Sequence, residues 1–205
     1  MKNSVSIYLA GKIQKSHENP NETYWTEEDI QLIQNISDPL KIHFLNPAIR
    51  TDDLSDQLSV FGRDMTQVYS VDLVLVDARE RRGLGVGAEM MWAKMNHLAV
   101  LTLAPWGSHY RKKKTSLLGV EVDNWVHPFI ECLSDGIVDD LEAASSWIKK
   151  IFLEQQVTIR GPEYIQKAMQ YYCTSQFDCD TPMQDLATSC QTLQEKIQDI
   201  KTGAF

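Results

Sequence analysis

The sequence predicts an α/β domain of three layers, in which helices cover both faces of a parallel β-sheet. Apolar runs of strand length alternate along the chain with longer segments whose apolar residues recur at helical spacing. Functional residue types fall at or just beyond the ends of several of these runs, namely Tyr8, Asn46, Asp77, Gly83 and Glu89. Parallel strands end at one edge of a sheet, so these residues are expected to lie together where such folds bind ligands.

Five apolar segments have the length of buried strands, so a five-stranded parallel sheet of the Rossmann-like or flavodoxin-like kind is expected. The segments are residues 5–10, 42–45, 73–76, 100–104 and 136–138. Helices are expected at residues 26–36, 61–69, 86–98, 124–133 and 140–153. Residues 106–123 form a long loop in this interpretation, which makes them a candidate lid or binding loop.

The predicted organisation is one α/β domain at residues 1–153, followed by a helical C-terminal extension at residues 154–205. Gly161-Pro162 opens one expected helix, and a polar break separates it from a second helix over residues 183–200. Two helices bury too little apolar surface for a core of their own. The extension is therefore expected to pack on the main domain or on another subunit.

Composition and charge argue against several classes of protein. With 43% hydrophobic and 23% charged residues, the 205-residue chain has the composition of a soluble globular protein. No stretch reaches the apolar length that spans a bilayer, and the N-terminus lacks the apolar core of a signal peptide. A cytoplasmic protein without a membrane partner is therefore expected. The net charge of −8 argues against nucleic acid as the main partner.

Two further groups of residues are expected to be unremarkable in function. The basic run Arg111-Lys112-Lys113-Lys114 falls in the expected long loop, where a solvated surface is the simpler interpretation. The cysteines show no C-x-x-C spacing and are expected to be free thiols. Neither a metal site nor a cofactor is expected.

The most informative stretch joins the third strand to the helix that follows it. The strand ends in Asp77, and a charged loop leads into Gly83-Leu-Gly85-Val-Gly87-Ala-Glu89. Glu89 is expected in the first turn of the helix, where exposed N–H groups and the positive end of the helix dipole favour its ionised form. An ionised carboxylate at the carboxyl end of a strand is a candidate nucleophile.

The glycines of this stretch have other interpretations. Glycine also occurs at strand-to-helix turns because the backbone needs positive φ or close packing there. A dinucleotide-binding loop is a third interpretation, but the spacing G-x-G-x-x-G is absent and the glycines lie late in the chain.

Several motifs, in this order and spacing, resemble the nucleoside 2-deoxyribosyltransferase family. They are Ile7-Tyr8-Leu9-Ala10-Gly11, the Arg-Asp pair ending at Asp64, Val-Leu-Val-Asp77, and the glycine-rich segment ending at Glu89. Within the same superfamily, the loop before Glu89 looks closest to the 2′-deoxynucleoside 5′-phosphate N-hydrolases. The resemblance covers roughly residues 4–150 and does not reach the C-terminal extension.

The resemblance implies that the N-glycosidic bond of a 2′-deoxynucleoside is cleaved and the deoxyribosyl group passes to another nucleobase. It implies a nucleophile at Glu89, an aspartate that supports the base and proton transfer at Asp64, and a tyrosine holding the glutamate at Tyr8. Asp77 either touches the ribose or caps the loop that follows it. Substrate-binding positions are expected at Gly11, Asn46, Asp77, Gly83, Gly85, Gly87, His127 and Phe129.

One position departs from the family pattern. Where the transferases carry an aspartate and the nucleotide hydrolases a serine that helps to hold the 5′ end, this chain has Gly83. Arg81 or Arg82 beside it could hold a phosphate by charge-assisted hydrogen bonds, although an exposed arginine pair is an equal alternative. Hydrolysis of 2′-deoxynucleoside 5′-monophosphates, with release of free base, is therefore the alternative activity.

The family also implies an assembly. A late helix of one subunit completes the neighbouring site there, and the match of His127-Pro-Phe129 to that helix predicts a homodimer or higher homo-oligomer. Two other classes remain open: a nucleotide-sensing module without turnover, and a degenerate structural subunit. The joint presence of Tyr8, Asp64 and Glu89 argues against the structural subunit.

Overall fold

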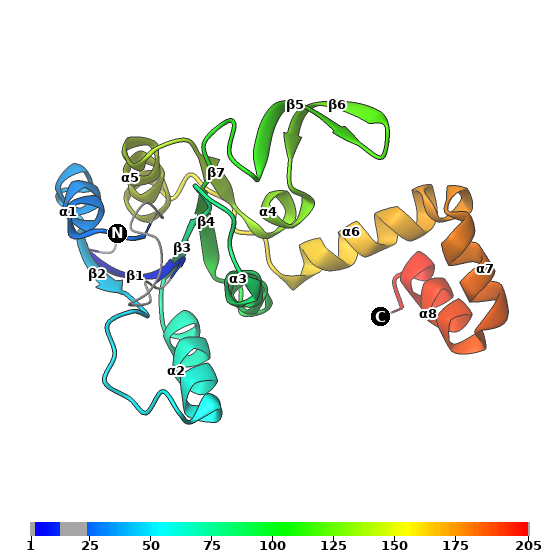
Figure 1. The fold of residues 1–205 in the computed structure, drawn as a ribbon, viewed down its shortest axis with the longest axis horizontal. Coiled ribbons are helices and arrows are strands. Elements are labelled where there is room, and N and C mark those ends of the chain that lie inside the picture. Colours follow the sequence, from blue (N-terminus) through cyan, green and yellow to red (C-terminus); the bar gives the residue numbers. More distant parts are fainter. Residues whose placement is uncertain (1–2, 13–23, 205) are drawn as a thin grey trace. The chain divides into compact units, whose positions relative to one another are not determined.

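The first part of the chain forms the predicted three-layer α/β domain (Figure 1). The computed structural model describes residues 3–12 and 24–204, and the chain divides into two compact units, Met1–Arg160 and Gly161–Phe205. Within the described residues, five parallel strands form one sheet in the order β2-β1-β3-β4-β7. They are β1 Ser4–Ala10, β2 Lys41–Leu45, β3 Leu73–Asp77, β4 Ala99–Leu103 and β7 Gly136–Val138. The fold class and the five predicted strands are confirmed.

Helices cover both faces of this sheet. Helix α1, Glu27–Ile36, packs with α5, Leu141–Lys149, and helix α2, Gln57–Tyr69, packs with α3, Leu84–Met95. Figure 1 shows the two pairs on opposite sides of the sheet. Thr26 caps α1 as predicted, because its side chain accepts a hydrogen bond from the backbone N–H of Asp29. Helix α2 begins at Gln57, not at residue 61, because Asp56 caps it.

The alternation of side chains along β1 decides which residues reach the functional face. Val5, Ile7 and Leu9 belong to the buried core that also contains residues of α1 and α5. Successive side chains of a strand point to opposite faces. Tyr8 therefore faces the layer formed by α2 and α3, and its side chain is completely buried.

Helix α3 is fixed to the sheet near its C-terminal end. Lys94, 1% exposed, forms an ion pair with Asp135 and donates a hydrogen bond to the carbonyl of Leu98. The carboxylate of Asp135 also accepts from the backbone N–H of Val100, at the start of β4. A buried ion pair with further hydrogen bonds has a demanding geometry, so this cluster sets the position of α3 along the sheet.

The segment expected to be a loop instead contains an antiparallel hairpin. Strands β5, Arg111–Leu117, and β6, Val120–Val126, are joined by Leu118 and Gly119, which both have positive φ. The basic run thus lies in a strand, and the helix expected from residue 124 is only α4, Pro128–Leu133. Both faces of the hairpin are largely exposed, so its sequence lacks the apolar alternation that indicates a strand.

The second unit contains helices around a small core. They are α6 Pro162–Ser175, a 3₁₀ turn Phe177–Cys179, α7 Thr181–Ser189 and α8 Gln191–Thr202. The core contains Cys173, Ala187 and Ile197, so the expectation that the extension is too small for a core of its own is wrong. The single helix expected over residues 183–200 is thus wrong, because the chain is extended at Cys190 and breaks there into α7 and α8.

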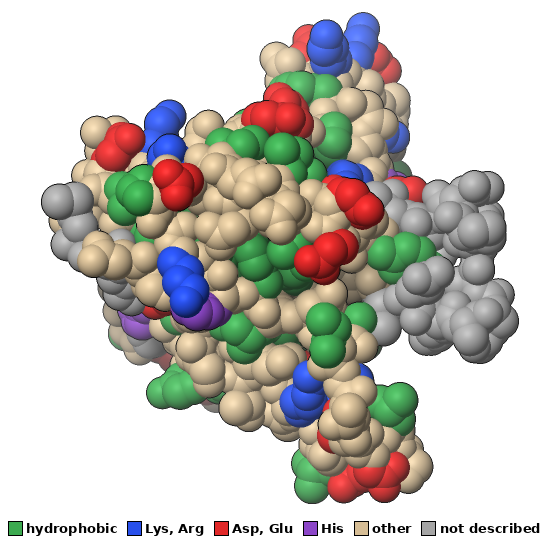
Figure 2. All heavy atoms as spheres, turned by 90° about the vertical axis from the view of Figure 1, so that its left-hand side faces the viewer, with side chains coloured by type: hydrophobic (Ala, Val, Ile, Leu, Met, Phe, Trp, Pro, Cys, Tyr) green, Lys and Arg blue, Asp and Glu red, His purple; other side chains and the backbone are tan. Residues whose placement is uncertain are grey.

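Surface charges are mixed on the side of α1 and β2. In Figure 2, which views the molecule from that side, acidic and basic side chains are interspersed among apolar ones. In the part of the chain that the structure describes, no helix is both long and apolar enough to cross a membrane.

The contact between β7 and α5 generates a stability prediction. A Cβ atom at Gly136 would lie 2.8 Å from Cε2 of the Trp147 indole, a distance that real Cβ atoms do not show. We expect Gly136→Ala to destabilise the protein by about 2 kcal/mol, since an overpacked core shifts or strains its neighbours. Gly62→Ala in α2 is the control, because nothing lies within 4 Å of the added Cβ. Urea unfolding measures both, and equal stability of the two variants would contradict the prediction.

Candidate functional site

A hydrogen bond between a buried tyrosine and a glutamate lies at the centre of the site. The hydroxyl of Tyr8 on β1 donates to Oε1 of Glu89 on α3 at 2.9 Å. The order of the strands reverses between β1 and β3, so the two side chains meet at the switch point of the sheet. Burial and the adjacent Glu89 raise the pKa of Tyr8, so its hydroxyl stays protonated and remains a donor.

The electrostatic setting of Glu89 differs from the sequence expectation. Helix α3 begins at Leu84, with Gly83 as its N-cap, and no acidic residue lies in its first turn. Glu89 is therefore beyond the exposed N–H groups, and the expectation that they stabilise its anion is wrong. Burial is the main cause that raises the pKa of Glu89, to about 7. The nearby charge of Asp64 raises this pKa further, and the hydrogen bond from Tyr8 lowers it.

The second carboxylate oxygen of Glu89 is available for chemistry. Oε2 is buried, and none of the described residues forms a hydrogen bond with it. A buried carboxylate oxygen without a partner carries a free-energy penalty that native proteins usually avoid. Glu89 thus combines one oxygen fixed by Tyr8 with one oxygen left unsatisfied.

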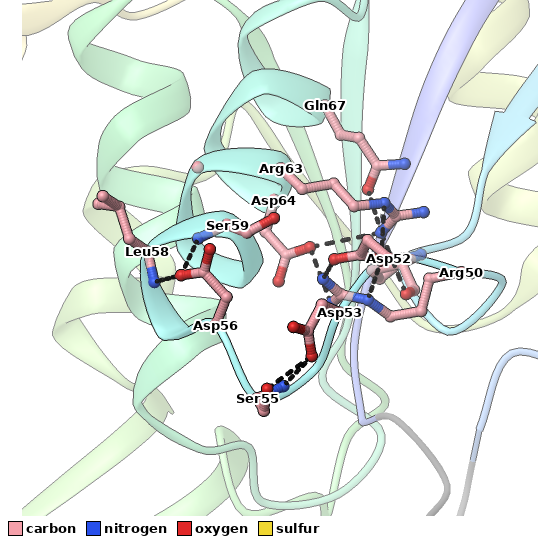
Figure 3. Close-up of polar contacts among 12 residues, drawn as sticks. Arg50, Asp52, Asp53, Ser55, Asp56, Leu58, Ser59, Arg63, Asp64 and Gln67 are labelled. Atoms are coloured by element: carbon pink, nitrogen blue, oxygen red, sulfur yellow. Dashed lines mark hydrogen bonds and ion pairs between the residues drawn. The ribbon is translucent and has the colours of Figure 1, made fainter.

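Asp64 lies on α2 among two arginines, as Figure 3 shows. Its Oδ1 is 3.4 Å from Nη1 of Arg50 and 3.5 Å from Nη1 of Arg63. Burial raises the pKa of Asp64, and the two guanidinium groups act in the opposite direction. The Asp64 charge influences both Tyr8 and Glu89. The structure thus brings the three expected catalytic residues into one electrostatic cluster.

Asp77 is buried in a different ion cluster. Its side chain is 0% exposed, with Oδ1 3.0 Å from Nε of Arg79 and Oδ2 2.6 Å from Nη2 of Arg82. Both oxygens are engaged by arginines, and Oδ1 also accepts from the backbone N–H of Arg79. The capping interpretation matches this geometry, whereas a ribose contact would need one arginine to move aside.

A second group of expected residues lines a cavity of about 330 Å³ beside the start of α3. Gly83, Gly87, His127 and Phe129 all line it, together with other residues that include Arg81, Arg82, His109 and Tyr110. Neither Tyr8, Asp64 nor Glu89 belongs to its wall. Helix α3 connects the two groups, since Gly87 and Met90 face the cavity and Glu89 lies between them in the sequence.

His127 and Tyr110 hold the hairpin end of this cavity. The rings of Tyr110 and His127 meet edge to face at 5.6 Å, and the Tyr110 hydroxyl accepts from the backbone N–H of Arg82 at 2.8 Å. Burial lowers the pKa of His127, and His109 lowers it further. His127 thus favours its neutral form at the cavity wall.

In the described structure, neither backbone conformation nor close packing requires glycine at the start of α3. Gly83, Gly85 and Gly87 do not have positive φ, and a Cβ atom on any of them would meet nothing within 4 Å. The interpretation that these glycines serve a turn or close packing is therefore wrong within the described residues.

Gly11 and Asn46 lie apart from the other expected residues. Both line a smaller hollow of about 110 Å³, shared with Tyr24 and Trp25. A Cβ atom at Gly11 would approach the Trp25 ring to 3.1 Å, so glycine permits close packing there. The side chain of Asn46 accepts a hydrogen bond from the backbone N–H of Ala48. These contacts account for Gly11 as a position of close packing and for Asn46 as part of a turn.

The sequence reasoning missed Arg50 and Asp52 at the site. Nε of Arg50 donates to Oδ1 of Asp52 at 2.8 Å, and a second guanidinium nitrogen binds the other oxygen. The signal was present as Arg-Thr-Asp in the polar segment after β2, a spacing that permits a local ion pair. In residues 3–12 and 24–204, no group of three or more His, Cys, Asp or Glu side chains is arranged to hold a metal ion.

The fold and the carboxylate cluster define an α/β protein with a site at the switch point of a parallel sheet. No protein-family model matches the sequence, and no curated protein matches it significantly. Among solved structures, the chain is similar to the 2-desoxiribosyltransferase from Leishmania mexicana, with 18% sequence identity and a TM-score of 0.49. The match covers 72% of this chain and 99% of that one. At this identity and TM-score the similarity carries no inference about activity.

The raised pKa of Glu89 generates a prediction about stability and pH. The pKa of Glu89 is about 7 in the folded protein and 4.5 in its ordinary state, so the folded chain holds this proton more tightly. The corresponding stability is present below the ordinary pKa and is lost as the pH rises to the folded value. Glu89→Gln should therefore gain stability over wild type between these values, by about 3 kcal/mol at most.

Thermal unfolding at about pH 4 and about pH 8 measures this gain, since both conditions lie outside the titration window. Glu142→Gln, at an exposed position of α5, is the matched control. The burial argument would be contradicted if Glu89→Gln and wild type differed in thermal stability by the same amount at both pH values.

Proposed function

We propose that this protein cleaves the N-glycosidic bond of 2′-deoxynucleosides and transfers the deoxyribosyl group to another nucleobase. The observation that carries the proposal is the half-satisfied carboxylate of Glu89, fixed through one oxygen by Tyr8 and unpartnered at the other among the described residues. Such a group destabilises the folded protein in its ionised form, and strongly perturbed carboxylates of this kind cluster at functional sites. The motifs that resemble the nucleoside 2-deoxyribosyltransferases point to the same residues.

The first half of the reaction forms a covalent intermediate. Oε2 of Glu89 bonds to C1′ of the sugar as the bond from C1′ to the base nitrogen breaks. The electron pair of that bond leaves with the base, and Asp64 supplies a proton to it, so the departing base is neutral. The charge that develops on the sugar is oxocarbenium-like, and the Glu89 carboxylate stabilises it.

The second half reverses these steps with an acceptor. A nitrogen of an incoming base bonds to C1′, the bond to Glu89 breaks, and the proton of the incoming base returns to Asp64. Water performs the same step as hydrolysis, so one site supports transfer or hydrolysis according to which acceptor is bound. Two displacements at C1′ retain its configuration.

Tyr8 serves as the residue that orients the nucleophile. Its hydroxyl fixes Oε1, so the carboxylate presents Oε2 in one direction. The same hydrogen bond favours the ionised form of Glu89 against the effect of burial. Tyr8→Phe should thus reduce turnover without changing the packing of β1.

The alternative activity is hydrolysis of 2′-deoxynucleoside 5′-monophosphates. The cavity beside the start of α3 favours it, because the cationic side chain of Arg81 lines that cavity. Arg82 is a weaker candidate, since its side chain is 3% exposed and already pairs with Asp77. In this activity Arg81 holds the 5′-phosphate, and Arg81→Gln should raise KM for monophosphates far more than for nucleosides.

A homodimer or higher homo-oligomer remains part of the proposal. His127 and Phe129 line a cavity of their own chain, and Phe129 is 66% exposed. An exposed aromatic ring at a cavity mouth can cover a neighbouring site as well as its own. The oligomeric state in solution is the observation that tests the shared site.

The activity itself is tested with a panel of substrates. We expect base exchange when a 2′-deoxynucleoside is incubated with a second free base, and hydrolysis when no acceptor is present. Chromatography of purine and pyrimidine deoxynucleosides and of their 5′-monophosphates measures the products. Release of base from monophosphates alone would establish the alternative, and binding without any product would indicate a sensing module.

The nucleophile is tested by substitution and by trapping. Glu89→Ala should lower kcat by about a thousandfold or more while substrate still binds, since the lost interaction belongs mainly to the transition state. A slow 2-fluoro sugar analogue should add the mass of its sugar to Glu89 of the wild-type protein, as measured by peptide mass spectrometry. An active Glu89→Ala protein, or label on another residue, would refute the assignment.

A further inference from the structure

Arg50 makes its polar contacts with carboxylates. Its side chain is 9% exposed, and within the described residues all of its hydrogen bonds and ion pairs go to the carboxylates of Asp52 and Asp64. Arg63, in contrast, also donates to the backbone carbonyls of Pro47 and Ile49. Arg63 thus fixes the chain after β2, whereas Arg50 serves only the two aspartates.

The geometry assigns different tasks to the two ends of Arg50. Asp52 binds Nε and Nη2 in a fork, which fixes the plane of the guanidinium group (Figure 3). The remaining nitrogen, Nη1, lies 3.4 Å from Oδ1 of Asp64. Asp52 thus aims Arg50 at Asp64 and also neutralises part of its charge.

Charged and titratable groups from every adjoining element interact electrostatically with Asp64. Arg50 and Asp52 come from the segment after β2, Arg63 from α2 itself, Glu89 from α3 and Tyr8 from β1. The charges of the two arginines and two aspartates cancel when both aspartates are ionised, and the charge of Asp64 in turn raises the pKa of Glu89. Loss of Arg50 makes the charge of this cluster more negative, whereas loss of Asp52 makes it more positive.

We propose that Arg50 and Asp52 are positioning residues that set whether Asp64 carries the proton it gives to the departing base. This inference rests on the proposed function for its catalytic meaning, although the charge balance can be measured in the absence of any substrate. Both arginines favour the carboxylate anion, and Asp52 limits that effect. Burial, together with Asp52, raises the pKa of Asp64, so that a proton donor is kept beside two cations.

The first test is a direct titration of Asp64 in the free protein by ¹³C NMR of its side-chain carboxyl. Asp52→Asn should lower the pKa of Asp64 by about one unit. Arg50 and Arg63 then lose the Asp52 carboxylate that partly neutralises them, and their charges act on Asp64 more strongly. Arg50→Gln should raise this pKa by about one unit, because a cation is lost while Asp52 still repels. Arg50→Lys keeps the charge and should give a smaller shift than Arg50→Gln.

Asp53→Asn is the matched control for this titration. Asp53 adjoins Asp52 in the sequence, but among the described residues its carboxylate accepts hydrogen bonds only from the backbone and hydroxyl of Ser55. The Asp64 titration should not change in this variant. The proposal would be overturned if the Asp64 pKa moved in the same direction in Asp52→Asn and Arg50→Gln, or did not move in either variant. A merely structural role does not predict shifts in opposite directions.

The second test compares leaving groups. A nucleoside needs a proton on its departing base, whereas a nitrophenyl 2-deoxyriboside releases a stable anion without one. Asp52→Asn should slow nucleosides by about tenfold, as expected for weakened general acid catalysis, and leave the nitrophenyl substrate within about twofold of wild type. Equal slowing of both substrates would refute a role through Asp64.

The two tests separate the inference from the proposed function. If wild type turns over neither substrate, the proposed function fails, and the titration still decides whether Arg50 and Asp52 control Asp64. If wild type is active but the titration shows no opposed shifts, the inference fails alone.

Discussion

The hydrogen bond from Tyr8 to Glu89 is the interaction on which the site depends. It exists because β1 alternates its side chains between the two layers, and because the cluster of Lys94 and Asp135 fixes α3 along the sheet. A slip of β1 by one residue would turn Tyr8 into the layer of α1 and α5. The apolar contacts of Ile7 and Leu9 on the opposite face therefore determine the position of Tyr8.

Three carboxylates gather near the carboxyl edge of the sheet, and their partners differ. Asp77 is held by Arg79 and Arg82, and Asp64 by Arg50 and Arg63. Glu89 has a neutral hydroxyl instead of a cation. A cation beside Glu89 would stabilise its anion and weaken its nucleophilicity. A hydroxyl also fixes one oxygen, but it stabilises the anion less. Within the described residues Glu89 forms no ion pair, and this distinguishes it from Asp64 and Asp77, which are both held by arginines.

The sequence predicted the parallel sheet because each strand is a short apolar run, such as Leu73-Val-Leu-Val76, and buried strands leave that pattern. Motifs in the sequence also predicted Tyr8, Asp64 and Glu89 as site residues, and the structure brings these three side chains together. The hairpin of β5 and β6 was missed because its residues face solvent on both sides, so no apolar period marks it. The Arg50–Asp52 pair was missed because ion pairs have no periodicity in sequence, and the pKa of Glu89 depends on burial that only the fold creates.

The glycines before Glu89 connect the carboxylate cluster to the adjacent cavity. Gly85 and Gly87 lie inside α3, where each weakens the helix by about 1 kcal/mol relative to alanine. Neither packing nor backbone conformation in the described residues requires them. Gly83, Gly85 and Gly87 place no side chain at three positions around the start of α3, between Leu84 and Val86, so a ligand could approach the unpaired N–H groups there closely. The same helix thus presents its N-terminus to the cavity and carries Glu89 further along, an arrangement that suits the proposed reaction, in which a substrate is held at one end and cleaved at the other.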